Sequence, residues 1–213
     1  MIEIDAETDD ELPILPRELT NVPDEVCRVG PPQIPVIEEP YGARLVDPDV
    51  HAELISEWMN MPHLVESWES AWPPERWRLY LKAQLAGTFS RPYLTSRKGE
   101  DIGYIELYRA AKDSIATRYD AHPHDLGIHA AIADTKLVNR GIAPRMLPKL
   151  MRDLFDLEPE CRRIMFDPDH RNTGARRLVE YVGCTFLGEH QMSNRKMALY
   201  VFPRTPEDIP AHR

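Results

Sequence analysis

The 213-residue sequence is poor in cysteine: it has three, Cys27, Cys161 and Cys184, and they are widely spaced. An odd number without paired spacing argues against a disulfide framework, and no secretory signal pattern precedes them. These absences favour a reducing compartment, so a cytoplasmic location is expected. The sequence also has no apolar run near the ~20 residues that a membrane-spanning helix needs, and no membrane span is expected.

An excess of positive charge is missing as well, because the formal net charge is -9. Residues 1–40 hold 11 of the 35 acidic side chains and two of the 26 basic ones, which leaves residues 41–213 with 24 of each sign. A neutral body behind an acidic leading segment lacks the basic stripe of a nucleic-acid-binding protein. Binding to nucleic acid is therefore not expected.

The leading segment 1–40 also holds seven of the 20 prolines and shows little hydrophobic periodicity. This composition is typical of an extended or partly disordered segment, which we interpret as an N-terminal arm. The alternative is a segment that covers a site or contacts a partner. Length and composition predict a single globular domain at 41–203, followed by a short tail at 204–213.

Within the first part of that domain, the patterns predict a strand, two helices and then three antiparallel strands. Asp47 and Pro48 are a typical start for the first helix, and Gly87 is a typical stop for the second. An aromatic loop with Trp68 and Trp72 is expected between the two helices. The strands are expected at 42–47, 92–97 and 103–108, followed by one that carries His129.

The last quarter of the sequence predicts strand, helix and strand, with a carboxylate where the first of these strands ends. A short apolar run through Phe166 stops at Asp167, and an apolar stripe of helical period then runs to Gly183. An open α/β sheet binds ligands outside the carboxyl ends of its strands. Asp167 is therefore a candidate reactive group.

A second candidate for the functional site lies upstream. There the strand carrying His129 is followed by a turn at Gly141 and then by a helical pattern. Exposed amides and the helix dipole make such a turn a natural phosphate site. Pro148 lies inside the pattern, where it removes a helical hydrogen bond. The helix is therefore expected either to start late or to kink.

The order of these elements, β-α-α-β-β-β-α-β-α-β-β, predicts an α/β (α+β) fold with a mixed, mostly antiparallel sheet and flanking helices. With the turn at Gly141 and the Asn172-x-x-Ala-x-x-Leu helix, it resembles the GCN5-related N-acyltransferase fold, whose fourth and fifth strands splay to admit a pantetheine arm. The resemblance covers about 41–203. Four blocks narrow it to the siderophore N-acyltransferases, with the mycobactin lysine N-acyltransferases as the nearest likeness. These blocks are 58–64, 103–113, 125–134 and 162–172.

The resemblance implies that a long fatty acyl chain is transferred from an acyl carrier protein or acyl-CoA to the ε-amine of lysine or N6-hydroxylysine. This is a step in mycobactin biosynthesis, and so in iron acquisition. It implies no tightly bound cofactor, since acyl-CoA or acyl-phosphopantetheine enters as the donor substrate. His129 and Asp167 fall on the family's functional pair.

Amine chemistry asks for such a pair independently of the resemblance. A lysine amine with a pKa of ~10.4 is only about one part in two thousand deprotonated at pH 7, a cost of about 4.6 kcal/mol unless a base takes the proton. Asp167 accepts the proton or holds the substrate, and His129 relays or accepts it; the residues leave open which is the base. The alternatives are a hydrogen-bonded core histidine and a turn-capping aspartate.

Further site residues are expected around this pair. Amides of Ile128 and Ala130 are candidates for stabilising the oxyanion. Trp68, Trp72 and Tyr108 are candidates for lining the acceptor or acyl channel, although such aromatics are more often core. The expected donor-binding residues are Ile128, Ala130, Arg140, Gly141, Ile142, Ala143 and Asn172. Candidates for attracting an acidic carrier protein, or simply for a solvated helix face, are Arg140, Arg145, Lys149 and Arg152.

Two positions depart from the family pattern. Val138 stands where many relatives have a basic or amide side chain in the pyrophosphate turn, so a weaker grip on pyrophosphate is expected. A carrier-protein donor has one phosphodiester there in place of the pyrophosphate, so the weaker grip costs it less binding than it costs acyl-CoA. Val179 stands where many relatives have a tyrosine that protonates the departing thiolate. A thiolate with a pKa near ~8.5 leaves without an acid, so the loss is modest.

Some features of the sequence match other functions. The spacing of His129 and Asp134 matches a glycerolipid acyltransferase motif, but residues five apart on a strand point to opposite faces. His122 and His124 suggest a metal clip, but no further ligands have matching spacing, so no metal site is expected. An acetyl-CoA-dependent acetyltransferase of another small amine, such as an aminoglycoside, and a noncatalytic acyl-pantetheine-binding module stay open. A monomer is expected, because no exposed apolar stripe is left unassigned.

Overall fold

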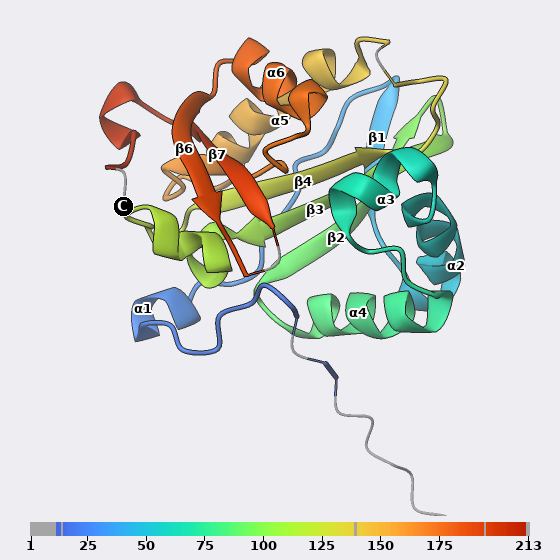
Figure 1. The fold of residues 1–213 in the computed structure, drawn as a ribbon, viewed down its shortest axis with the longest axis horizontal. Helices are drawn as coiled ribbons and strands as arrows, with labels where there is room; N and C mark the ends of the chain where they lie inside the picture. The colour runs from blue at the N-terminus through green and yellow to red at the C-terminus, as the bar shows by residue number, and fades with distance from the viewer. Residues whose placement is uncertain (1–11, 14, 139, 194, 212–213) are drawn as a thin grey trace, which may run out of the picture.

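A seven-stranded sheet runs through the computed structural model, which describes residues 12–13, 15–138, 140–193 and 195–211 (Figure 1). The strands lie in the order β1-β2-β3-β4-β5-β7-β6. Their bounds are β1 (Tyr41–Leu45), β2 (Ser90–Arg97), β3 (Glu100–Arg109), β4 (Leu126–Ile132), β5 (Arg163–Phe166), β6 (Thr185–Gln191) and β7 (Lys196–Pro203).

All neighbouring strands run antiparallel except β4 and β5, which run parallel. This parallel pair is joined at Leu126 with Ile164 and at Gly127 with Met165, although β4 continues to Ile132. The two strands therefore splay apart beyond Gly127. The predicted mixed, mostly antiparallel sheet with splayed fourth and fifth strands is confirmed.

Helices flank the sheet in two groups. In Figure 1, α2, α3 and α4 lie together on the right, and α5 and α6 lie at the top. Leu150 and Leu154 of α5 pack with Ile128 on one face of the sheet, whereas Ile55 of α2 packs with Tyr104 on the other. The helices are α1 (Asp24–Cys27), α2 (Pro48–Met59), α3 (Pro62–Trp68), α4 (Pro74–Ala86), α5 (Ile142–Leu157) and α6 (Thr173–Tyr181). Short 3₁₀ turns are η1 (Ala110–Lys112), η2 (Ser114–Arg118) and η3 (Pro206–Asp208).

Local sequence signals set several of these bounds. The Asp47 side chain accepts a hydrogen bond from the Asp49 amide at 3.0 Å, and Pro48 is the first residue of α2, as predicted. Gly183 follows α6 with a φ of 97°, in the left-handed region that favours glycine. A side-chain cap, the fixed φ of proline and a left-handed glycine thus set these helix ends.

The predicted aromatic loop between the first two helices is wrong in its first part. Pro62 opens α3, a helix of seven residues that ends at Trp68, and Trp72 lies in the connection to α4. Pro62 can end one helix or begin the next, because proline's fixed φ and missing N–H suit the first helical position. Three helices therefore separate β1 from β2, not two.

Pro148 does not delay the helix in which it lies. α5 begins at Ile142, directly after Gly141, so the predicted late start is excluded. A row of buried residues, including Leu147, Met151 and Leu154, fixes the helix against the sheet. This packing offsets the hydrogen bond that the proline removes.

The described part of the N-terminal arm lies against the domain. Leu15, Val26 and Val29 are buried. The Leu19 amide donates to the Lys112 carbonyl at 2.8 Å, and Lys112 Nζ donates to the Val29 carbonyl at 2.6 Å. Residues 1–11, on which part of the predicted disorder falls, lie outside the described residues. From Leu15 onwards the arm is thus joined to η1 by backbone and side-chain contacts.

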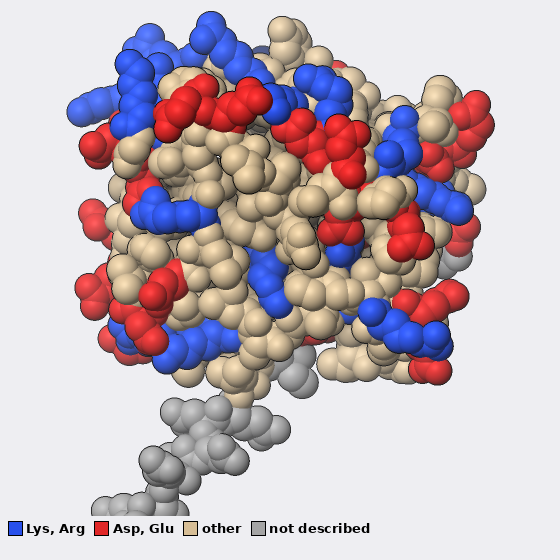
Figure 2. Space-filling view, turned by 180° about the vertical axis from the view of Figure 1, so that it is seen from behind, with Lys and Arg blue, Asp and Glu red and all other residues tan. Residues whose placement is uncertain are grey.

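The molecular face opposite to that of Figure 1 carries charges of both signs. Figure 2 shows Lys and Arg interspersed with Asp and Glu, mostly around the rim of a largely uncharged centre. No helix among the described residues is long and apolar enough to cross a membrane.

Candidate active site

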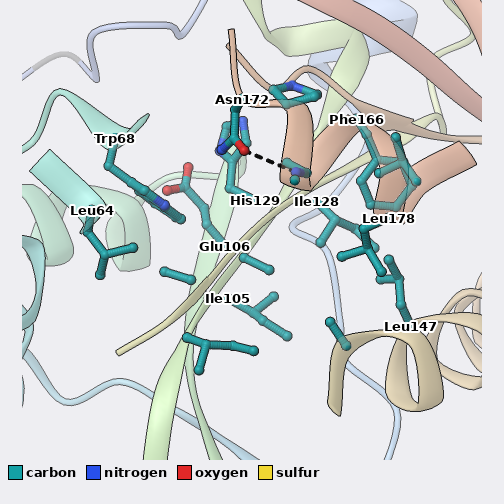
Figure 3. A pocket seen from close by; sticks show the side chains of 18 of the residues that line it. Leu64, Trp68, Ile105, Glu106, Ile128, His129, Leu147, Phe166, Asn172 and Leu178 are labelled. Atoms are coloured by element: carbon teal, nitrogen blue, oxygen red, sulfur yellow. Dashed lines mark hydrogen bonds between the residues drawn. The ribbon is translucent and has the colours of Figure 1, made fainter. Parts of the chain in front are cut away.

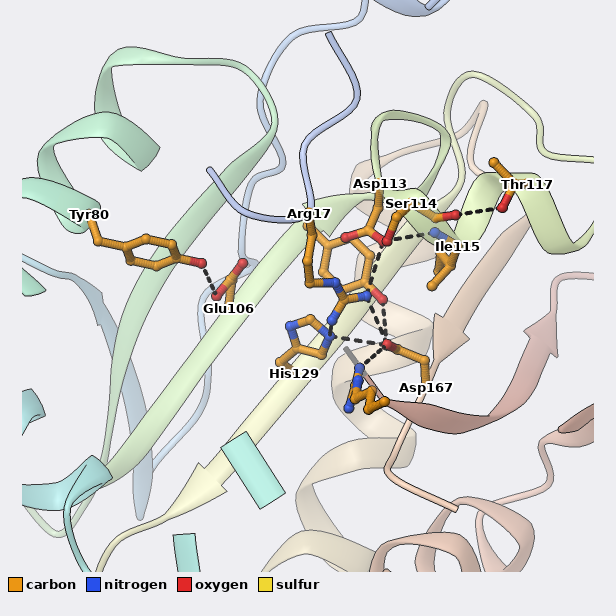
Figure 4. Close-up of polar contacts among 11 residues, drawn as sticks. Arg17, Tyr80, Glu106, Asp113, Ser114, Ile115, Thr117, His129 and Asp167 are labelled. Atoms are coloured by element: carbon orange, nitrogen blue, oxygen red, sulfur yellow. Dashed lines mark hydrogen bonds and ion pairs between the residues drawn. The ribbon is translucent and has the colours of Figure 1, made fainter. Parts of the chain in front are cut away.

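Five polar side chains from separate parts of the chain meet at the opening between β4 and β5 (Figure 4). Tyr108 comes from β3 and His129 from β4. Asp167 follows β5 directly, and Arg195 precedes β7. The fifth, Arg17, comes from the N-terminal arm. The sheet therefore brings together His129 and Asp167, the predicted functional pair, which lie 38 residues apart in the sequence.

Asp167 is the centre of this cluster. Its Oδ1 accepts hydrogen bonds from the Tyr108 hydroxyl at 2.8 Å and, when that nitrogen carries a proton, from His129 Nε2 at 3.0 Å. Its Oδ2 accepts from Arg17 Nη2 at 2.7 Å and Arg195 Nη2 at 2.5 Å. Burial alone raises the pKa of Asp167, but the charges of Arg17, His129 and Arg195 outweigh it and hold that pKa well below its usual range. Asp167 is thus a permanent carboxylate.

Gly127 makes room for this arrangement. It lies opposite Tyr108 in the β3–β4 register, and a Cβ added to it would lie 2.0 Å from Tyr108 Cζ. Because glycine has no side chain, the tyrosine ring crosses β4 at this point and delivers its hydroxyl to Asp167. The same ring lies 4.6 Å from the His129 ring, centre to centre.

His129 Nε2 has two neighbours that make opposite demands. Arg17 Nη1 lies 2.6 Å away and can only donate, so it requires an unprotonated Nε2. Asp167 Oδ1 lies 3.0 Å away and can only accept, so it requires a protonated Nε2. The contacts are therefore matched to two protonation states of the same nitrogen.

A cavity of about 950 Å³ opens beside this cluster and is lined by His129, Asp167 and Arg17. Figure 3 shows Leu64 and Trp68 on one side of it and Leu147, Phe166 and Leu178 on the other, with Glu106 and His129 between them. The volume is at the upper end of the ~300–1,000 Å³ typical of ligand cavities. Its two largely apolar walls come from α3 and from α5 with α6.

Glu106 is a charged group inside this apolar cavity. It lies opposite His129 in the β3–β4 register and is buried. The Tyr80 hydroxyl donates to its Oε2 at 3.4 Å. Burial raises the pKa of Glu106, because the cavity solvates a carboxylate less well than water does.

The edge of β4 presents backbone groups to the opening. Ala133 donates to the Ile102 carbonyl, and Ala110 donates to the Asp125 carbonyl, in one continuous antiparallel register. Alternate residues of such a strand bond to the same neighbour, so the odd-numbered residues of β4 bond to β3 and the even-numbered ones face β5. Ile128 is level with the last residue of β5, and the Ala130 amide faces the space beyond it.

The glycine turn lies at the other end of the opening. Gly141 precedes α5 with a φ of 74°, and Gly141, Ile142 and Ala143 line the cavity. The N-terminus of α5, where the first amides of a helix have no partner within it, therefore lies at the cavity wall. Arg140 is exposed on the surface, where its Nε donates to the Lys136 carbonyl at 3.3 Å, and it is not part of the cavity wall.

The other predicted residues fall into two groups. Trp68, Trp72 and Asn172 line the cavity, and Asn172 Oδ1 also caps α6 by accepting from the Ala175 amide at 3.0 Å. Tyr108 does not line the cavity: its side chain is fully buried beneath His129 and contacts Asp167 instead. Val138 and Val179, where the family pattern differs, both lie in the cavity wall.

The sequence did not predict three of the site residues, Glu106, Arg17 and Arg195. An acid within the apolar run of β3 was a usable signal for Glu106. Arg17 lies in a segment without periodicity, and Arg195 lies in a polar loop, so neither had a sequence signal. Among the described residues, no group of three or more His, Cys, Asp or Glu side chains is placed to hold a metal ion.

A sheet splayed between β4 and β5, with a helix N-terminus at one end of the opening and a carboxylate at the other, defines an acyltransferase of the GNAT fold. The family model described as an acetyltransferase (GNAT) domain matches residues 47–192, and the chain belongs to this family. The predicted fold and enzyme class are confirmed by this match.

Individual relatives are more specific. "Lysine N-acyltransferase MbtK" of Mycobacterium sp. (strain MCS) is 64% identical over 206 residues, which cover 96% of this chain and 84% of that protein. The Mycobacterium tuberculosis (strain ATCC 25618 / H37Rv) protein of the same name is 55% identical over 195 residues, or 92% of each chain. Among solved structures, aminoglycoside acetyltransferase AAC(6')-Ib in complex with coenzyme A has a TM-score of 0.68 and 25% identity, and the match covers 77% of this chain and 95% of that one.

Proposed function

We propose that the protein transfers a long-chain fatty acyl group from an acyl-pantetheine thioester to the ε-amine of lysine or N6-hydroxylysine, in the biosynthesis of a mycobactin-type siderophore. The observation that carries this proposal is the pairing of His129 and Asp167 at the mouth of an apolar cavity of about 950 Å³. The high identity to lysine N-acyltransferases supports the same substrate class.

The donor fits the opening between β4 and β5. The first amides of α5, after Gly141, suit a phosphate of the pantetheine arm, and the arm then runs along the free edge of β4. At its end, the Ala130 amide is the donor best directed at the thioester oxygen, where negative charge develops. Ile128 lies next to it along the same edge.

Proton transfer is assigned to His129. Asp167 is a poor base, because its pKa is held well below the usual range. Its carboxylate instead accepts a hydrogen bond from His129 once His129 is protonated, and so stabilises the positive charge of the ring. The acceptor ammonium gives one proton to His129, and the resulting amine attacks the thioester carbon. The C–N bond forms and the C–S bond breaks. The nitrogen loses its second proton as the amide forms, His129 releases the first to solvent, and the departing pantetheine thiolate takes up one proton, directly or through water. No side-chain acid is required for this last step, because a thiol has a pKa near ~8.5.

The apolar walls suit a long acyl chain better than an acetyl group. Leu64 and Trp68 line one side, Leu147 and Leu178 line the other, and Trp72 also lines the cavity (Figure 3). An acetyl group would leave most of this surface without a partner, whereas a fatty chain gains about 0.8 kcal/mol for each CH₂ that it buries.

An acyl carrier protein is the proposed physiological donor. Arg140, Arg145, Lys149 and Arg152 are all exposed at or near the N-terminal half of α5, beside the opening that takes the pantetheine. Positive charges at this place suit the acidic surface of a carrier protein. A cytoplasmic, monomeric enzyme is proposed with it, and light scattering of the purified protein checks the oligomeric state.

The test is mass spectrometry of lysine and N6-hydroxylysine incubated separately with acetyl-CoA, palmitoyl-CoA and a long-chain acyl carrier protein. The expected product is a long-chain amide that is lost with Asp167→Ala and with His129→Gln. Acetylated product alone would identify a small-amine acetyltransferase. Donor binding without any product would identify an acyl-pantetheine-binding module.

A further inference from the structure

Arg17 is the member of the site cluster that comes from the N-terminal arm, ahead of the matched family domain at residues 47–192. Its guanidinium donates from Nη2 to Asp167 Oδ2 at 2.7 Å and to Asp113 Oδ1 at 3.0 Å. Its Nη1 lies 2.6 Å from His129 Nε2. It thus touches both members of the proposed functional pair, although 112 residues separate it from His129.

The arm fixes the position of this guanidinium from both sides. The Ser114 amide donates to the Arg17 carbonyl at 3.0 Å, and the Leu19 amide donates to the Lys112 carbonyl at 2.8 Å. Leu15, two residues earlier, is buried in the core beside Tyr108. The backbone on each side of Arg17 is therefore bound to the domain, so the arm places the side chain in the site.

A guanidinium donates hydrogen bonds and never accepts them. Facing Nε2 at 2.6 Å, it requires the lone pair of that nitrogen, and so a neutral His129 with its proton on Nδ1. If Nε2 carries a proton, it can no longer accept from Arg17, and it donates to Asp167 Oδ1 instead. Arg17 and a proton therefore compete for one nitrogen.

Asp113 gives the displaced guanidinium a second place to bind. Its side chain is buried, and its Oδ2 has no hydrogen-bond partner among the described residues. Oδ1 of the same carboxylate already accepts from Arg17 Nη2. When His129 takes a proton, Nη1 can shift its donation to this carboxylate without leaving Asp167.

We propose that Arg17 is a positioning residue, which keeps His129 unprotonated and Asp167 ionised until the acceptor amine delivers its proton to His129. This inference rests on the proposed function, in which His129 is that proton acceptor. The other charged or titratable groups facing the histidine are Asp167, with Arg195 behind it, Glu106 and Tyr108 from β3, and Asp113 beyond Arg17. The arm is thereby part of the active site.

The experiment is the pH profile of kcat/KM of the full chain, together with an NMR spectrum of the His129 ring at neutral pH, whose signal is identified among those of the eight histidines by its loss in His129→Gln. In Arg17→Gln and Arg17→Met, Nε2 loses its cationic neighbour and is expected to donate to Asp167 instead, so the NMR signal of that nitrogen should become that of a protonated one. The acid limb of kcat/KM should move to higher pH by between about 1 and 3 units, because the base must be unprotonated. Arg28→Gln, exposed on the same arm, should change neither.

Two further outcomes decide the proposal. Millimolar methylguanidinium should return the acid limb of kcat/KM of Arg17→Met towards that of the wild type, whereas tetramethylammonium should not. An unchanged acid limb in both neutral variants, or a loss of activity that is equal at every pH, would overturn the positioning role. The proposed function fails separately, if His129→Gln and Asp167→Ala keep wild-type turnover.

Discussion

Replacing Gly127 by alanine tests whether the crossing of Tyr108 over β4 positions the site. The added Cβ would lie 2.0 Å from Tyr108 Cζ and 2.3 Å from Cε2. Carbon atoms pack at about 3.5–4.0 Å, so the ring must move by roughly 1.5 Å. The ring has no free space, because it is fully buried and lies against His129.

The expected fall in the free energy of unfolding has two causes. Overpacking a core position costs about 1–3 kcal/mol. Moving the ring also weakens the hydrogen bond from Tyr108 to the Asp167 carboxylate, and bonds to charged groups contribute about 1.5–3 kcal/mol. We expect the free energy of unfolding of Gly127→Ala to fall by roughly 2.5–6 kcal/mol, which is less than the ~10 kcal/mol of a typical domain.

Urea unfolding and steady-state kinetics of the same preparation measure both effects. Activity should fall at least ~10-fold in kcat, because Asp167 and His129 lose a shared neighbour while the cavity stays open. Gly30→Ala is the matched control: no atom lies within 4 Å of its added Cβ, so its stability and kcat should stay at the wild-type level.

The double variant Tyr108→Ala/Gly127→Ala separates the steric cause from a general weakening of β4. Without the ring, the added methyl group has room, so Gly127→Ala should cost less than ~1 kcal/mol in the Tyr108→Ala background. Equal costs in both backgrounds, or wild-type stability of Gly127→Ala itself, would refute the argument that glycine is needed for the ring to pass.

Three further predictions concern the charges of the site and its surroundings. Asp167→Asn should lower kcat by ~100-fold or more. The lowered pKa of Asp167 stabilises the wild type at every pH above ~3.9, the pKa of an aspartate in the unfolded chain. The loss of stability of Asp167→Asn in urea unfolding should therefore be the same at pH 6 and pH 8. Glu106 has a raised pKa, so its contribution to stability falls as pH rises above ~4.3, and Glu106→Gln should gain more stability at pH 8 than at pH 5 in the same assay. Arg145→Glu/Lys149→Glu should raise KM several-fold for a carrier-protein donor and leave KM for acyl-CoA unchanged.

The sequence predicted the elements whose ends depend on local chemistry. Asp47 acts through its own side chain, and Pro48 and Gly183 act through their own backbone, so the pattern alone located the start of α2 and the end of α6. The helix α3, which Pro62 begins, was predicted as part of a loop, because the chemistry of proline suits the end of one helix as well as the start of another. The splayed strands came from the family resemblance, since a gap between strands leaves no periodic signal of its own.

The site itself was predictable only where a side chain follows a strand end or a turn. Asp167 and Gly141 carry such signals, and the structure brings both to the cavity. Arg17 and Arg195 do not, because their function depends on where an irregular segment is tied down by distant residues. Tyr108 shows the opposite limit: its aromatic pattern suggested a channel wall, but only the three-dimensional contact with Gly127 shows that it lies behind the histidine.

Two buried carboxylates adjoin His129, and their surroundings move their pKa values in opposite directions. Asp167 is held ionised by Arg17, His129 and Arg195 despite its burial, whereas burial raises the pKa of Glu106. Pairs of titratable groups whose environments separate their pKa values are a mark of acid–base sites. A proton arriving from the acceptor amine therefore finds a stable place on His129 facing Asp167, a carboxylate held ionised by its cationic neighbours. The asymmetry directs the proton away from the cavity, where it would return to the nucleophile, and towards the buried carboxylate.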